Sequence, residues 1–252
     1  MTKLNYFIPF VFAIAVLGIL EWFISHPGFI YIALGLFVVL NLATAYFLGR
    51  KQQSDWWKFA LLPGLANIVT TSYMVILTND LLLQILILLL LIFNYIYWRY
   101  VFYYLHRQAQ YQPFSLENIS FYISFIIIFL LGSLTYGLRS LLSLSVLGLS
   151  IVIFVFLSTT VLQVFWISKL NWKKNLAYLV VIILVLMEMF YMLSFLPLDH
   201  NLLGFVWATI YYVIISIVSD KLKDRLTNQK VKYLLLLTGF SWLVLFLSAR
   251  WI

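Results

Sequence analysis

The sequence predicts an all-α fold, a polytopic bundle of transmembrane helices, on three observations. Hydrophobic residues make up 65% of the 252 positions, and charged residues make up only 10%. Soluble domains have roughly 45–50% apolar and about 25% charged residues, so most of this chain is expected to face lipid. The apolar residues gather in long runs, and the basic residues fall between alternate runs. We therefore expect a single integral membrane domain over residues 1–252.

About nine apolar runs are long enough to predict helices that cross the bilayer. They cover residues 4–23, 29–48, 59–77, 81–104, 119–136, 141–167, 176–196, 202–218 and 231–248. The breaks between them carry turn residues: His26-Pro27-Gly28, Thr78-Asn79-Asp80, Gly137-Leu138-Arg139-Ser140, and Pro197 before Asp199-His200-Asn201. Each run is expected to be helical because lipid offers no partner to free backbone groups. The short break at Gly137 is open to a second interpretation, a re-entrant bend.

The basic residues predict the orientation of the chain. If the N-terminus lies inside, Arg139 and Arg250 lie outside, and the other 14 of the 16 Lys and Arg residues, among them Lys3, lie inside. Cytoplasmic loops carry such an excess, so we expect the N-terminus inside and the C-terminus outside. The net charge of +8 then reflects membrane topology. Nucleic acid is accordingly not expected as a partner.

Glu188 stands alone within the apolar run 176–196. A charge at the bilayer centre costs about 2.5–3.5 kcal/mol on insertion scales, and desolvation favours the neutral acid. At the same depth the later runs present Thr209, Tyr211, Tyr212 and Ser241, and a hydroxyl from one of them is expected to bond the carboxyl group. Two interpretations stay open: a packing contact between helices, and a proton relay or substrate-binding acid.

A second polar group is expected on the outer face. It consists of His26, Asp80, Asp199 and His200, which follow or precede apolar runs on that side. These residue types suit a metal site or an acid/base pair, and they equally suit ordinary loop caps. Their spacing matches no diagnostic metal or catalytic motif, and the chain has no cysteine. We therefore predict no metal and no cofactor.

Aromatic and basic residues are concentrated over 95–107, at the predicted inner end of the run 81–104. Trp and Tyr belts with snorkelling Arg are typical of membrane interfaces, so this stretch, which includes Tyr97, Trp98 and Arg99, is expected to anchor the chain there. The basic loop 219–232 is expected to touch anionic lipid.

Four short pieces of the C-terminal third resemble a known group of proteins. The pieces are Glu188, the Phe195-Leu196-Pro197 break, the Tyr211-Tyr212 pair and Ala249-Arg250-Trp251. They resemble uncharacterised bacterial multi-pass membrane proteins that share a domain of unknown function. The resemblance implies a bacterial cytoplasmic membrane and implies no activity, because that family has none assigned.

Three functions are compatible with these observations. The first is a non-enzymatic small-solute or proton-coupled permease, or its accessory subunit, with Glu188 as the polar centre. The second is a membrane-embedded enzyme that acts on a lipid-linked substrate at the outer face, through Asp199, His200 and Glu188. The third is a structural subunit of a membrane complex. The expected partners are the lipid bilayer and, for an accessory or structural subunit, other membrane proteins.

Overall fold

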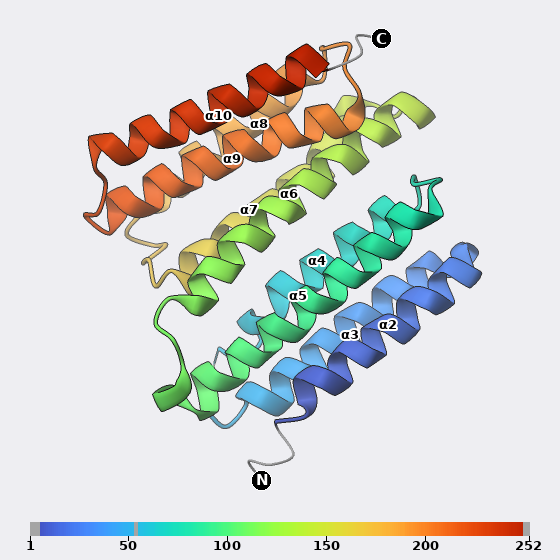
Figure 1. Cartoon of the computed structure of the whole chain (residues 1–252), viewed down its shortest axis with the longest axis vertical. Coiled ribbons are helices and arrows are strands. Elements are labelled where there is room, and N and C mark those ends of the chain that lie inside the picture. Colours follow the sequence, from blue (N-terminus) through green and yellow to red (C-terminus); the bar gives the residue numbers. More distant parts are fainter. Residues whose placement is uncertain (1–5, 53–54, 249–252) are drawn as a thin grey trace. The chain divides into compact units, whose positions relative to one another are not determined.

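The computed structural model describes residues 6–52 and 55–248, so Lys3, Arg250 and the segment Ala249-Arg250-Trp251 lie outside the described residues. The described residues form nine α-helices and contain no strand (Figure 1). Contacts divide the chain into two compact units, Met1–Ile123 and Ser124–Ile252. The expectation of one membrane domain stays a prediction, and so does the side of the membrane on which each terminus lies.

The first unit holds α2 (Ile8–Ser25), α3 (Ile30–Gly49), α4 (Lys58–Met74) and α5 (Asp80–His106). The second unit holds α7 (Val146–Ile167), α8 (Leu176–Leu193), α9 (His200–Leu222) and α10 (Asn228–Ser248), while α6 (Ser115–Leu142) runs across the division. Within the first unit α2 packs against α5 and α3 packs against α4. Within the second unit α8 packs against both α7 and α9, and α10 packs against α9.

Eight helices of the described chain are long and apolar enough to cross a bilayer. The predicted all-α polytopic bundle is therefore confirmed, and the chain is a multi-pass membrane protein. The ninth helix, α4, has 17 residues, which corresponds to about 25 Å at 1.5 Å per residue. This is somewhat shorter than a hydrocarbon core of about 30 Å.

Helix α4 packs against α3 and α5 and is mostly buried, which explains why it is less apolar than its neighbours. Twelve of its 17 residues are buried, including Pro63 and Asn67. Asn67 Oδ1 accepts a bond of 2.7 Å from Asn94 Nδ2 of α5. The Tyr97 hydroxyl donates to the Phe59 carbonyl at 3.0 Å. Polar groups are favoured here because they meet partners on other helices rather than lipid.

Two residues predicted as interface anchors are instead core residues. Tyr97 and Trp98 of α5 both have 0% of their surface exposed. Trp98 lies 5.5 Å, between ring centroids, from Phe12 of α2. The prediction was wrong for these two because aromatic side chains also fill the interior of a membrane bundle.

The break predicted at Gly137 is wrong in position. Helix α6 continues to Leu142, and the chain turns at Ser143, whose φ is 52°. Ser145 then caps α7 by accepting a bond of 3.3 Å from the Gly148 amide. Gly137 is buried inside α6, where a missing side chain permits close packing. The break at Asn79 is confirmed, because Asn79 caps α5 by accepting bonds from the Leu81 and Leu82 amides.

Helices α6 and α9 touch through their backbones at two glycines. A Cβ atom built on Gly204 would lie 2.3 Å from Ser133 Oγ and 2.6 Å from the Ser133 amide nitrogen. A Cβ atom on Gly132 would lie 3.0 Å from the Gly204 Cα atom. Gly204 was not identified as a contact residue from the sequence.

Replacing Gly204 by Ala should destabilise the protein, because the backbone of α6 would have to move. Overpacking costs roughly 1–3 kcal/mol. Gly239→Ala is the matched control, since a Cβ atom there meets nothing within 4 Å and Ala favours a helix by up to about 1 kcal/mol. Thermal unfolding in detergent should show a lower Tm for Gly204→Ala and an unchanged or higher Tm for Gly239→Ala. Equal Tm values for the two variants would contradict the backbone contact.

Candidate functional site

Glu188 lies on the face of α8 that points away from the rest of the second unit. The buried residues of this helix are Leu179, Ile182, Ile183, Leu186 and Phe190. At 3.6 residues per turn, Glu188 lies about 200° around the helix from Leu186, almost opposite the buried face. Val181 and Leu184 share its side and are 57% and 55% exposed. The carboxyl group is therefore exposed on the outside of this unit.

The exposed acid is well inside a membrane-spanning helix. It lies five residues before the end of α8 at Leu193, so about 7 Å along the axis from that end. Within the described part of the chain, no residue forms a hydrogen bond or ion pair with Glu188. A polar group that faces hydrocarbon without a partner carries the full cost of desolvation. Nothing in the described chain offsets that cost.

The hydroxyl groups expected around Glu188 have other partners. Thr209 donates to the Val206 carbonyl at 2.7 Å and accepts from Trp242 Nε1 at 2.8 Å, which ties α9 to α10. Ser241 donates to the Leu237 carbonyl at 2.8 Å.

The two tyrosines of the expected cluster lie elsewhere in the second unit. Tyr211 is 1% exposed, with its hydroxyl beside Ser124 of α6. The Tyr212 ring meets Phe125 edge-on, with ring centroids 6.0 Å apart. The structure thus does not bring the five predicted residues into one site.

The outer-face group divides between the two units. His26 and Asp80 belong to the first unit, where the His26 ring stacks on Trp22 with centroids 6.0 Å apart and Asp80 is an exposed residue at the start of α5. Asp199 and His200 belong to the second unit. Convergence of all four on one point stays a prediction. Within the described residues, no three His, Asp or Glu side chains gather as a metal site would require.

Asp199 and His200 line a polar cavity of about 310 Å³ within the second unit. The cavity is formed by the end of α6, the link between α8 and α9, and the first turn of α9. Its lining residues are Tyr136, Arg139, Ser140, Ser194, Leu196, Leu198, Asp199, His200 and Leu203. It combines one guanidinium, one carboxylate, one imidazole and several hydroxyl groups, a set that suits an anionic or zwitterionic solute.

Each charged side chain of this cavity is held by a local contact. Asp199 caps α9, with Oδ1 accepting from the Asn201 amide at 2.8 Å and Oδ2 lying 3.2 Å from His200 Nδ1. Arg139 donates from Nη1 to the Ser194 carbonyl, and its Cζ atom lies 5.8 Å from the Phe195 ring centroid. The sequence identified Asp199 and His200 but treated Arg139 only as an outer charge. The available signal was that Arg139, Asp199 and His200 were all predicted to lie on the outer side of the membrane.

Comparison with protein-family models, with curated proteins and with solved structures finds no match.

Substitutions at Asp199 should separate its capping role from its pairing with His200. Asp199→Ala removes the cap, and loss of a cap costs about 0.5–2 kcal/mol. Asp199→Asn keeps a capping oxygen and removes only the charge. We expect a lower Tm in detergent for Asp199→Ala and a Tm near that of the parent for Asp199→Asn. A similar loss in both variants would show that the carboxylate charge, rather than the cap, stabilises this end of α9.

Proposed function

We propose that this chain is a non-enzymatic subunit of a membrane-protein complex in the bacterial cytoplasmic membrane, accessory or structural in role. The observation that supports the proposal is the unpartnered Glu188 on the exposed face of α8. The bacterial cytoplasmic membrane rests on the resemblance to uncharacterised bacterial multi-pass proteins, and membership of that family is part of the proposal.

The energetic argument starts from the cost of the exposed acid. Insertion of an ionised residue at the bilayer centre costs about 2.5–3.5 kcal/mol. Glu188, about 7 Å from the end of α8, carries part of that cost when ionised, and a neutral carboxyl group still needs hydrogen-bond partners. A helix of another protein with Lys, Arg or an amide donor at the same depth would supply that partner. A two-fold symmetric contact with a second copy of this chain would bring another acid to the same place, which favours a different protein as the partner.

The accessory role is favoured over a permease by the position of Glu188. A permease that used this acid would need a water-accessible cavity that reaches it. The polar cavity at the start of α9 is lined by other residues, and Glu188 faces away from the interior of its unit.

The proposal is tested with a photo-cross-linking amino acid at Leu184, on the Glu188 face, and at Phe240 on α10 as the matched control. Leu184 is 55% exposed and Phe240 is 70% exposed. In host membranes we expect Leu184 to yield an adduct with one membrane protein that carries a basic or amide residue within a span. The adduct should decrease several-fold in Glu188→Gln, which keeps one acceptor oxygen but loses the charge, and disappear in Glu188→Leu, which offers the donor no acceptor.

Three results would contradict the proposal. The first is an adduct yield that does not depend on Glu188, and the second is an equal yield from Phe240. The third is an adduct with the mass of two copies of this chain, since that would assign the surface to self-association.

A second candidate function, an enzyme that acts on a lipid-linked substrate, is favoured by the cavity at Arg139, Asp199 and His200. An Asp–His pair can exchange protons, and a guanidinium can bind phosphate. Inorganic pyrophosphate is a suitable probe because lipid carriers are joined to their cargo through phosphate groups. This candidate predicts that pyrophosphate raises the Tm of the parent but not of His200→Ala or Arg139→Gln, and an unchanged Tm of the parent would exclude phosphate recognition in this cavity.

A further inference from the structure

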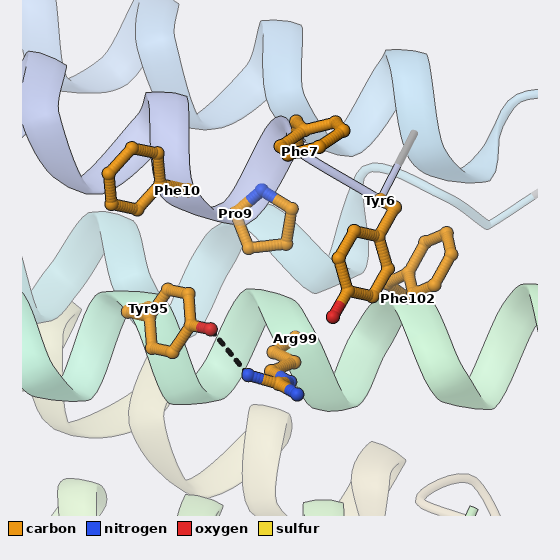
Figure 2. A pocket seen from close by; sticks show the side chains of 7 residues that line it. All are labelled: Tyr6, Phe7, Pro9, Phe10, Tyr95, Arg99 and Phe102. Carbon is orange, nitrogen blue, oxygen red and sulfur yellow. Dashed lines mark hydrogen bonds between the residues drawn. The ribbon is translucent and has the colours of Figure 1, made fainter. Parts of the chain in front are cut away.

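A second cavity, of about 290 Å³, lies in the first unit between the start of α2 and the C-terminal half of α5. Its lining residues are Tyr6, Phe7, Pro9, Phe10, Tyr95, Arg99 and Phe102. Figure 2 shows Arg99 between Tyr6 and Tyr95, with the ring of Phe10 farther along α2. The cavity is thus an aromatic pocket that contains one guanidinium. It belongs to a different unit from Glu188 and does not depend on the proposed complex.

Arg99 is held in place by two tyrosines of its own helix. Its Nη1 atom donates to the Tyr95 hydroxyl, and its Nε and Nη2 atoms donate to the Tyr103 hydroxyl at 3.3 and 3.2 Å. Its Cζ atom lies 5.6 Å from the Tyr95 ring centroid and 5.7 Å from that of Tyr103. Both tyrosines are four residues from Arg99, so they fix the guanidinium against α5 and reduce the entropy lost when a ligand binds.

The guanidinium keeps donors for a ligand. Arginine has five N–H groups, and the contacts with Tyr95 and Tyr103 use three of them. In the described part of the chain, no Asp or Glu forms an ion pair with Arg99. Arg99 lies seven residues before the end of α5 at His106, about 10 Å inside a membrane-spanning helix. A cation at this depth without an anion favours a ligand that carries one.

The walls of the cavity indicate which kind of anion fits. Phe7 and Phe10 are 60% and 57% exposed, so they offer apolar surface beside the guanidinium. Arg107 adds a second cation at the same end of the unit, with its Cζ atom 5.8 Å from the Tyr6 ring centroid. A soluble phosphate would leave the phenylalanine surface unused, whereas a phospholipid presents a phosphodiester next to its acyl chains. Basic pockets between membrane helices on the cytoplasmic side bind anionic headgroups.

We propose that this cavity binds the headgroup of an anionic phospholipid. The two remaining N–H groups of Arg99 donate to the phosphate oxygens, which suit the planar guanidinium. The first acyl carbons lie against Phe7 and Phe10. The predicted inner side of the membrane places the site in the cytoplasmic leaflet.

Binding is tested by native mass spectrometry on the full chain in detergent, with phosphatidylglycerol, phosphatidylcholine and glycerol 1-phosphate as probes. We expect phosphatidylglycerol to be retained more strongly than phosphatidylcholine, and glycerol 1-phosphate not to displace it. Arg99→Gln should weaken phosphatidylglycerol binding roughly tenfold or more, because a hydrogen bond to a charged group is lost.

Arg50→Gln is the matched control. Arg50 of the same unit also donates to a tyrosine four residues before it, Tyr46, and its Cζ atom lies 4.8 Å from that ring centroid. It does not line the cavity, so binding should be unchanged. Phe10 is exposed, so Phe10→Ala should leave folding unaffected. It should nevertheless weaken phosphatidylglycerol binding, even though Arg99 is still present.

Four results would overturn the proposal, and each removes a different part of it. Equal losses in Arg99→Gln and Arg50→Gln would indicate general attraction to basic residues. Displacement by glycerol 1-phosphate would assign the cavity to a soluble phosphate. Equal retention of phosphatidylglycerol and phosphatidylcholine would remove the preference for an anionic headgroup, and unchanged binding in Phe10→Ala would remove the role of the acyl chain.

Discussion

Lipid offers the backbone no hydrogen-bond partner, and this constraint determines the form of every membrane-spanning segment in the chain. Each helix satisfies its own N–H and C=O groups, so helices can recognise one another only through side chains and through close backbone contact. Gly132 and Gly204 provide such a contact between α6 and α9. The remaining specificity must come from the few polar side chains that the helices carry.

Most of the polar side chains use backbone carbonyl oxygens as acceptors. Asn41 donates to the Phe37 carbonyl of its own helix at 2.8 Å. Large aromatic donors reach across to a neighbouring helix, as Trp207 does to the Leu186 carbonyl at 2.9 Å and Tyr136 to the Phe190 carbonyl at 3.0 Å. A helical carbonyl oxygen has a second lone pair, so these bonds join helices without breaking the helical ladder. Buried polar residues of this kind need no function beyond packing.

The sequence was sufficient to predict the number and approximate limits of the helices, because hydropathy and turn residues act locally. It was not sufficient to predict which face of a helix is buried. The residues of other helices at the depth of Glu188 could be found by counting 1.5 Å per residue. Apart from Glu188, however, α8 is apolar on all of its faces, so no polar stripe marked the face that points outward. Gly137 was misinterpreted for a related reason, since glycine serves both as a turn residue and as a packing residue. The cavity around Arg139 depends on two segments, residues 136–140 and 194–203, that are far apart in the sequence, and no local pattern indicates that they lie close together.

The same constraint decides which exposed groups carry information about partners. In water an exposed apolar face indicates a missing partner, but in lipid it does not, because hydrocarbon solvates it as well as another helix would. The wide exposed face of α10, whose spanning window has 0% of its residues buried, is therefore uninformative. An exposed polar group in a span is informative, because lipid cannot satisfy it. Arg99 is partly satisfied by the hydroxyl groups of Tyr95 and Tyr103, whereas Glu188 has no hydrogen-bond partner within the described chain, so the α8 face is the stronger indication of another protein.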